Sequence, residues 1–399
     1  METAIASNIS YDADMIISRL GYRPESKFRA RAMMVARGQL PTLHRPLPLV
    51  DRPSSLGLLD RFPPEIMIMI LEQLDFQSLA RLSRASFQAD GYVRSFRDYQ
   101  YLVTHVPKTL KGLARLGIIE IHSVDDLYGA LQTDSCAVCG DCGPFLFLPT
   151  CQRCCWRCWR HHPAFRILEP RLAKRYYCLS KEDVAKLPVV HVRACDIRYN
   201  FYRSDFVFPN QGRAVSAKAA WDLGLVVHGS EEELIKAGLR NNCNSADNFW
   251  DAEYWLQAPK IQPHQHWLVN QPVIPQAPYR ARSYNSSATM PTMPFPIMAG
   301  GGRLEQALWC RGCRWVSNNG GRIDWGGPPA RLQSVLPLEY LTGEFSPMDV
   351  AYGLADRAWS RDTFLQHVRR CPVAYLFAPK LADIKDEEWD RIISTDMKR

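Results

Sequence analysis

The chain lacks any long hydrophobic run. Its longest apolar stretch lies within EIMIMIL at residues 65–71, far short of the roughly 20 apolar residues that a membrane-spanning helix needs. The first residues carry no basic start followed by an apolar segment, so we expect no secretory signal. These two absences predict a protein of the cytoplasm, the nucleus or both, with no membrane as a partner.

Signatures of catalysis are also missing. The glycine-rich stretches GGGR and NNGGR lack the Gly-Lys-Ser/Thr of a phosphate-binding loop, and no Ser/His/Asp set, acid pair or activated thiol stands out. The CxxC pairs lack the surrounding βαβ pattern of a thioredoxin-type site. Eight interleaved ligands for a self-contained RING ligase would need a histidine and nearly every cysteine. We therefore expect a protein that is not an enzyme.

What the chain does contain is typical of a folded protein. Of its 399 residues 46% are hydrophobic and 11 are tryptophan, which favours on the order of two or three domains. The formal net charge of +8 permits contact with acidic surfaces without requiring it. The 13 cysteines are odd in number and cluster in CxxC pairs, which favours zinc in a reducing compartment over disulfides.

The stretch from Leu56 to Ser86 predicts two short amphipathic helices. Two prolines and an acid at residues 63–65 suit a helix start. Apolar side chains then recur at helical spacing on a helix that ends near residue 74: Ile66, Met67, Ile70, Leu71 and Leu74. Asp75 can cap a second helix, on which Leu79 and Leu82 share a face. Helices this short cannot bury their own apolar surface, so they need a partner.

This stretch resembles the F-box, the module that docks a protein onto the Skp-type adaptor of a cullin–RING ubiquitin ligase. The family pattern is Leu-Pro-x-Glu-Ile, Ile-Leu, Leu-Asp, Ser-Leu and Leu-Ser. Here it reads Phe62-Pro63-Pro64-Glu65-Ile66, Ile70-Leu71, Leu74-Asp75, Ser78-Leu79 and Leu82-Ser83. Phe62 replaces the usual leucine, and Gly91 interrupts the segment where the family has a third helix. The alternative is a helical hairpin of an unrelated bundle.

The F-box assignment implies a set of adaptor contacts. These are the apolar residues and prolines of the motif: Phe62, Pro63, Pro64, Ile66, Ile70, Leu71, Leu74, Leu79 and Leu82.

Seven cysteines lie within residues 136–158. A CxxC turn lets two thiolates reach one ion, and zinc takes four such ligands in a tetrahedron. A glycine suited to the turn, a strand at 145–148 and a helix after the last cysteines predict a treble-clef-like or ribbon-like zinc module. The expected ligands are Cys136, Cys139, Cys155 and Cys158, with Cys151 and Cys154 as the alternative second pair.

A second, split zinc site is predicted near the C-terminus. Cys310 and Cys313 form another CxxC, and His367 and Cys371 follow at i and i+4 of a predicted helix, so that both point from one face. Three thiolates and an imidazole make an ordinary structural zinc geometry, and about two ions per chain are expected. The alternative is a surface histidine and a buried cysteine unrelated to the CxxC.

These features predict a mostly helical α+β fold, in which a helical F-box precedes a zinc-stapled C-terminal region with short strands and long loops. The expected segments are a flexible basic, proline-containing tail (1–53) with a short helix at 12–20, the F-box (54–100), a helical connector (101–135), the first zinc module (136–165), a helical and irregular region with a proline-rich loop at 258–302 (166–302), and the second zinc module with the C-terminal helix (303–384). Smaller expectations are a capping box of Ser123 and Asp126 and helices at 216–240 and 245–257.

Taken together, the F-box, the CxxCG turn, the run FLFLPTC-x-R-C-C and the later WCRGC with HxxxC resemble the cysteine-rich F-box proteins of filamentous fungi. The resemblance implies a non-catalytic substrate-recognition subunit of an SCF-type cullin–RING E3 ubiquitin ligase. Its F-box would bind a Skp-type adaptor, and its C-terminal region would select a protein target for ubiquitin-dependent degradation. The sequence does not name that target.

The alternative function is that of a zinc-dependent nucleic-acid-binding or regulatory protein. Arg153, Arg157 and Arg160 recur at i, i+4 and i+7 after the first cysteines and predict a basic helix that could lie against phosphates. Because a basic run is more often a solvated face, the sequence disfavours nucleic acid as a partner.

Overall fold

The computed structural model of the chain describes residues 12–24, 54–192, 212–243, 252–253, 255–256, 291–319, 354–371 and 374. These residues form mostly α-helices with short antiparallel strands, so the mostly helical α+β class is confirmed. The chain divides into two compact units. We call them the central unit (Ser26–Gln265 and Pro272–Pro296) and the terminal unit (Met1–Glu25, His266–Gln271 and Ile297–Arg399), and each is described by itself.

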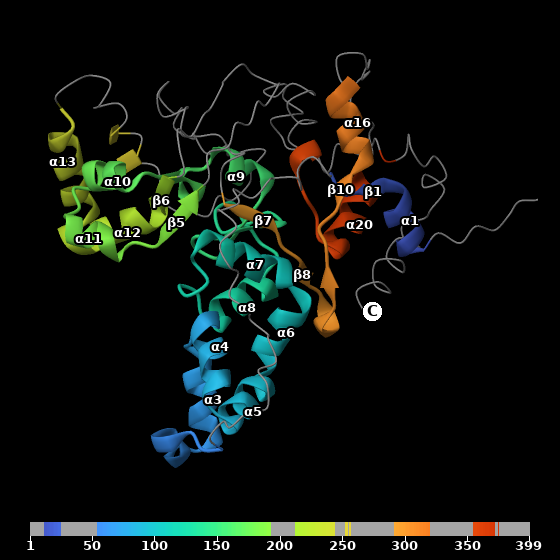
Figure 1. The fold of residues 1–399 in the computed structure, drawn as a ribbon. Coiled ribbons are helices and arrows are strands. Elements are labelled where there is room, and N and C mark those ends of the chain that lie inside the picture. The colour runs from blue at the N-terminus through green and yellow to red at the C-terminus, as the bar shows by residue number, and fades with distance from the viewer. Residues whose placement is uncertain are drawn as a thin grey trace, which may run out of the picture. The chain divides into compact units, whose positions relative to one another are not determined.

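The central unit begins with a run of short helices (Figure 1). They are the 3-10 helix η1 (Gly57–Arg61) and the α-helices α3 (Pro64–Glu72), α4 (Phe76–Ala85), α5 (Phe87–Ser95), α6 (Arg97–His105), α7 (Pro107–Leu116) and α8 (Val124–Gln132). Asp75 caps α4 by accepting hydrogen bonds from the backbone N–H groups of Gln77 and Ser78, as the sequence predicts. The predicted capping box of Ser123 and Asp126 is present at α8.

A third helix does follow the two that the sequence indicates. Helix α5 runs through Gly91, which is exposed and whose added Cβ would meet nothing within 4 Å. Ser86 starts this helix, because its hydroxyl accepts a hydrogen bond from the Ala89 N–H at 3.0 Å. The three helices share a core that includes Met67, Leu71 and Leu79, all at most 1% exposed.

The cysteine-rich segment forms a three-stranded antiparallel sheet in the order β3-β2-β7. Its strands are β2 (Phe145–Phe147), β3 (Gln152–Cys154) and β7 (Thr292–Pro294), and helix α9 (Trp156–His161) follows β3. The predicted strand at 145–148 is therefore present. Strand β7, however, comes from the segment expected to be a proline-rich loop. Its Met293 pairs with Leu146 of β2, so the end of that segment is a strand and not a loop. Residues 258–290 of the expected loop lie outside the described residues.

A second antiparallel sheet, in the order β4-β6-β5, carries the remaining helices of the central unit. The elements are β4 (Ile167–Leu168), α10 (Pro170–Tyr176), α11 (Lys181–Lys186), β5 (Val189–Val192), β6 (Gly212–Ser216), α12 (Ala217–His228) and α13 (Glu231–Asn241). The single helix expected at 216–240 is wrong. Gly229 adopts a left-handed φ of 78° and ends α12, and Ser230 caps α13. Of the helix expected at 245–257, only four residues are described.

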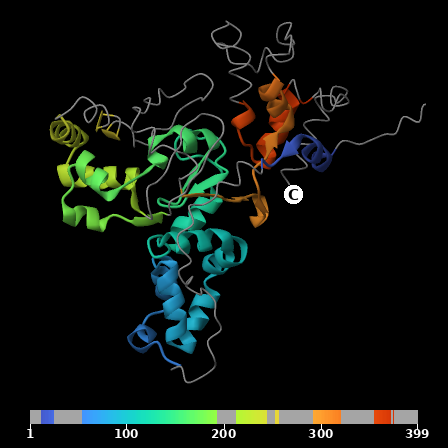
Figure 2. The ribbon, with the colours of Figure 1, turned by 45° about the horizontal axis from the view of Figure 1, so that its top comes forward.

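The terminal unit joins residues from both ends of the sequence (Figure 2). Its elements are α1 (Ala13–Leu20), β1 (Gly21–Tyr22), β8 (Ile297–Met298), η4 (Gly300–Gly302), β9 (Leu304–Glu305), β10 (Trp309–Cys310), α16 (Arg311–Asn319) and α20 (Arg361–Arg370). Strand β1 pairs antiparallel with β10, so that Gly21 faces Cys310. Strands β8 and β9 form a separate antiparallel pair.

The short helix expected at 12–20 is present as α1, but the flexible tail expected over residues 1–53 is wrong for residues 12–24. Helix α1 is amphipathic, and its Ile16 and Leu20, each 1% exposed, pack in one core with Phe364 and Val368 of α20. The sequence shows this apolar face but not the helix that covers it. Residues 25–53 lie outside the described residues.

Two glycines in the central unit are expected to respond oppositely to alanine. A Cβ on Gly238 would lie 2.6 Å from the Tyr176 carbonyl oxygen and 2.6 Å from Leu256 Cδ1, so Gly238→Ala should destabilise this unit by about 1–3 kcal/mol. Gly91→Ala has open space and should stabilise α5 by about 0.5–1 kcal/mol. Denaturant unfolding of the two variants measures both shifts. Equal effects of the same sign would contradict this account of the packing around α13.

Candidate metal centres and an exposed helical surface

Four cysteine sulfur atoms meet in the central unit. The Sγ atoms of Cys136, Cys139, Cys155 and Cys158 all lie within 4.8 Å of one another, and those of Cys139 and Cys155 are 3.6 Å apart. A tetrahedral ion with metal–sulfur bonds of about 2.3 Å would space its thiolates about 3.8 Å apart. This set of four is therefore geometrically compatible with one metal ion.

Local backbone geometry presents these sulfurs in two pairs. After Cys139, Gly140 takes a left-handed φ of 76° and donates its N–H to the Cys136 carbonyl at 2.9 Å, which closes the CxxC turn. The second pair begins α9: Cys155 is its N-cap, and its Sγ accepts a hydrogen bond from the Cys158 N–H at 3.3 Å. A turn and a helix start thus aim two thiols each at one point.

Hydrogen bonds within this cluster shift thiol pKa values in opposite directions: the pKa of Cys136 is lowered, whereas the pKa values of Cys155 and Cys158 are raised well above the ordinary value. Burial alone would raise the pKa of the Cys136 thiol, but hydrogen bonds from Cys139, Cys155 and Cys158 outweigh burial and hold that pKa well below its ordinary value. A thiolate shared among buried thiols is a strong ligand for a soft or borderline metal ion.

The sequence leaves two candidates for the second pair of ligands, and the structure distinguishes between them. Cys151 and Cys154 are buried but do not join the four clustered sulfurs. Cys154 lies on β3, where it pairs with Phe145 of β2. These two cysteines are packed core residues, and the helix start supplies the second pair.

A second set of ligands meets in the terminal unit, where Cys310, Cys313, His367 and Cys371 also lie within 4.8 Å of one another. Cys313 Sγ is 3.3 Å from His367 Nε2 and 3.6 Å from Cys371 Sγ. Hydrogen bonds from Cys313 and Cys371 hold the pKa of the Cys310 thiol well below its ordinary value. Strand β10 and the start of α16 provide one pair, and α20 and the residue after it provide the other.

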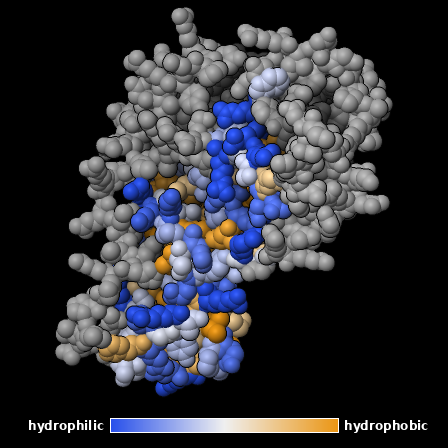
Figure 3. Space-filling view, turned by 90° about the vertical axis from the view of Figure 1, so that its right-hand side faces the viewer, coloured by the Kyte–Doolittle hydropathy of each residue, from blue (hydrophilic) through white to orange (hydrophobic). Residues whose placement is uncertain are grey.

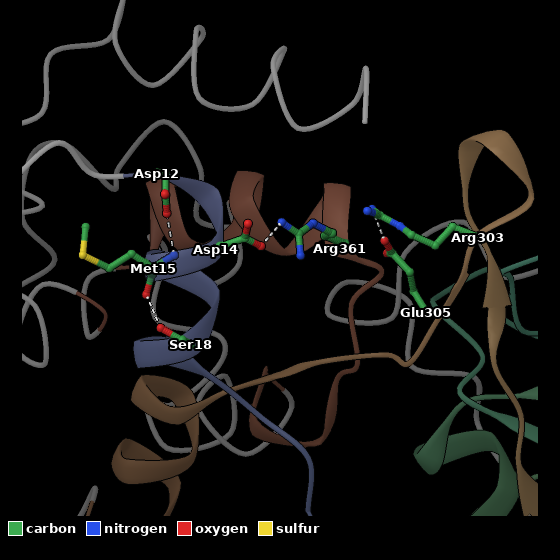
Figure 4. Close-up of polar contacts among 7 residues, drawn as sticks. All are labelled: Asp12, Asp14, Met15, Ser18, Arg303, Glu305 and Arg361. Carbon is green, nitrogen blue, oxygen red and sulfur yellow. Dashed lines mark hydrogen bonds and ion pairs between the residues drawn. The ribbon is translucent and has the colours of Figure 1, made fainter.

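Residues of the N-terminal segment support this second centre, although the sequence gave no sign of it. Arg361 of α20 forms an ion pair with Asp14 of α1 at 2.6 Å, which Figure 4 shows between the two helices. Arg311, between two ligand cysteines, donates from Nε to the Gly21 carbonyl at 3.2 Å. The amphipathic character of residues 13–20 is the only feature of the sequence that indicates a helix packed in this unit.

The structure does not support the basic helix predicted from Arg153, Arg157 and Arg160. Arg153 lies on β3, before α9 begins, and is 2% exposed. Its guanidinium donates to the carbonyls of Ala130 at 2.6 Å and Gly143 at 2.8 Å, and also to that of Pro296. Burial lowers the pKa of Arg153 to about 10. This arginine ties backbone segments together and is not available to phosphates; the side chains of the other two are not described.

Several large apolar side chains are exposed on the helices of the predicted F-box. Figure 3 shows orange and pale-orange residues on the lower end of the molecule, the height at which α3 and α5 lie in Figure 1. The exposed apolar side chains around η1, α3 and α5 are Leu58 (75%), Phe62 (45%), Ile66 (40%), Ile68 (42%), Met69 (59%) and Phe87 (43%).

The predicted adaptor contacts divide into two groups. Phe62, Pro63, Pro64 and Ile66 are exposed, whereas Ile70, Leu74 and Leu82 are half-buried. Leu71 and Leu79 are 0% exposed, so assigning them as contacts is wrong: they hold the three helices together. Leu58 and Met69 are exposed apolar residues that the sequence analysis missed, although EIMIMIL is apolar on every face of its helix.

Comparisons with family models, with curated proteins and with solved structures find no match to this chain. Among the described residues, no helix combines the length and apolar character needed to cross a membrane.

Each set of four ligands is expected to hold about one metal ion per chain. Cys136→Ser should lower the metal content by that amount, and His367→Ala should lower it by the same amount independently, because the two sets lie in different units. Elemental analysis of the purified full chain measures this. Cys243→Ser, at an exposed cysteine outside both sets, is the control and should change nothing. A metal content unaffected by His367→Ala would remove the second centre.

Apolar packing rather than charge should hold α1 in place. Ile16→Ala removes a side chain that is 1% exposed and should cost about 2–5 kcal/mol in the terminal unit. Asp14→Asn removes an ion pair whose aspartate side chain is 61% exposed, and should cost about 1 kcal/mol or less. Thermal unfolding of both variants tests this order. The reverse order would show that the ion pair is the main anchor.

Proposed function

We propose that this protein is a non-catalytic substrate-recognition subunit of an SCF-type cullin–RING E3 ubiquitin ligase, and that α3, α4 and α5 are its F-box. The observation that carries the proposal is the exposed apolar surface of α3 on three short helices that carry the F-box pattern. Ile66, which matches the F-box pattern, is 40% exposed, and Phe62, which stands where the pattern has leucine, is 45% exposed. Contiguous exposed apolar residues on so small a helical unit favour a protein partner.

The exposed side of α3 supports a specific docking surface. A helix turns by about 100° per residue, so Ile66 and Ile70 share one flank of α3, about 160° from Ile68, and Met69 lies about 60° from Ile66 and about 100° from Ile68. Phe62 immediately precedes this helix. We propose that this flank, together with Phe62, receives the Skp-type adaptor, while the buried Met67 and Leu71 lie on the inner side of α3.

We further propose that the ion in both centres is zinc and that its role is structural. Sets of four thiolates, or of three thiolates and one imidazole, leave no open coordination position and match the ligands that zinc prefers. A bound ion would crosslink the CxxC turn between α8 and β2 to the start of α9 in the central unit, and β10 and the start of α16 to the end of α20 in the terminal unit. The ligands would therefore stabilise the regions that follow the F-box and that would select the target.

In this proposal the protein accelerates ubiquitination by proximity alone. Binding the adaptor through one surface and a target through another raises the effective concentration of the target's lysines at the ligase. No described residue needs to make or break a bond. The burial of Arg153 also weighs against the nucleic-acid-binding alternative, because it removes one of the three arginines on which that alternative depends.

The docking surface can be tested with a matched pair of variants. Ile66→Asp combined with Met69→Asp should weaken binding to a purified Skp-type adaptor by about 100-fold or more, because each lost apolar contact is worth roughly 1.5–3 kcal/mol. Ile68→Asp, at a residue of nearly the same exposure (42% against 40% for Ile66) on the other flank, should leave binding nearly unchanged. Titration calorimetry on the full chain provides the measurement.

Circular dichroism melting of the same variants controls for folding, since all three altered residues are already exposed. Undiminished adaptor binding by the double variant would contradict the F-box assignment. An equal loss in Ile68→Asp would instead show that the assigned flank is wrong.

A further inference from the structure

The proposed imidazole ligand of the terminal unit lies against a tryptophan. The ring centroids of His367 and Trp359 are 4.4 Å apart and their planes meet at 17°, which is a face-to-face stack. Phe364 also approaches His367, but its ring centroid is 6.4 Å away and tilted by 47°. Trp359 is therefore the aromatic residue that sets the plane of the imidazole.

The backbone holds this tryptophan in place independently of its side chain. Leu308 and Trp359 form an antiparallel bridge in which each N–H donates to the other's carbonyl at 2.9 Å. Leu308 is two residues before the ligand Cys310, so one bridge places both the indole and the first thiolate. A second link joins the same segments, because Trp309 Nε1 donates to the Asp356 carbonyl at 3.3 Å.

The indole face is also an attractive surface for positive charge. The guanidinium carbon of Arg357 lies 4.5 Å from the Trp359 ring centroid, so the ring already takes part in one cation–π contact. An imidazole that donates its electron pair to a metal ion becomes electron-poor. Stacking on an electron-rich indole should then favour the metal-bound imidazole over the free one.

We propose that Trp359 is a positioning residue of the terminal metal centre, which fixes the ring plane of His367 for coordination and slows the loss of the ion from that centre. The inference rests on the proposed metal binding there, but not on adaptor docking. The four-cysteine centre of the central unit has no imidazole ligand. Its ion should therefore be indifferent to Trp359, which provides an internal reference in the same molecule.

The test compares Trp359→Leu, which removes the aromatic ring, with Trp359→Phe, which keeps one. In the full chain loaded with zinc, a chelator in excess should remove one of the two ions roughly 3- to 10-fold faster from Trp359→Leu than from the unaltered protein, as the loss of one aromatic stack implies. The other ion should leave at an unchanged rate. Trp359→Phe should restore most of the retention.

Loading the same variants with Co²⁺ adds a readout that general loosening of the fold would not move. The visible absorption bands of the ion report its ligand geometry, so they should shift in Trp359→Leu and stay in Trp359→Phe. Trp315→Leu, at a tryptophan of α16 that is 39% exposed, is the matched control and should change neither rate nor spectrum.

Unchanged release and an unchanged cobalt spectrum in Trp359→Leu would overturn the inference, and so would equal effects of the leucine and phenylalanine variants. An unaltered protein that binds no ion at Cys310, Cys313, His367 and Cys371 would overturn the proposed metal binding itself. Those two failures are distinguishable, because the second appears before any substitution at residue 359.

Discussion

Buried sulfur ligands gathered at one point are the constraint around which each unit is organised. Hydrogen bonds from neighbouring thiols lower the pKa of Cys136 and of Cys310 well below the ordinary value, which places negative charge where water is excluded. Buried charge without a partner is costly, so a cation at each centre would offset that cost. The turns and helix starts around these cysteines place the sulfur atoms where they could bind such an ion.

Near each centre, contacts also join residues that are far apart in the sequence. In the central unit Arg153 follows the cysteine pair of the turn and joins backbone segments from three parts of the chain, ending at Pro296. In the terminal unit β10 carries Cys310 and at the same time pairs with β1 near the N-terminus. The strands beside each centre contribute only two or three residues and would have little stability alone, so they depend on such long-range contacts.

The helical part follows a different principle. Helices α3, α4 and α5 need no metal ligand; they are held by caps at Asp75 and Ser86 and by a small core around Leu71 and Leu79. That core is too small to cover α3, which leaves Ile66 and Met69 exposed. Apolar residues of the same motif therefore have two different roles, in the core or on the exposed surface. The direction in which each side chain leaves the helix axis decides which role it has.

Local patterns by themselves determined the starts of α3, α4 and α8, the two CxxC turns, strand β2 and the nearness of His367 and Cys371 at the end of α20, because each depends on residues a few positions apart. Tertiary structure alone decided between Cys155–Cys158 and Cys151–Cys154, because that choice depends on which cysteines the β3–α9 junction turns inward. It also decided that Arg153 is buried and that residues 13–22 complete the terminal unit. Contacts between residues hundreds of positions apart leave no periodic signal in a single sequence, since either partner alone is merely an amphipathic helix or a basic residue.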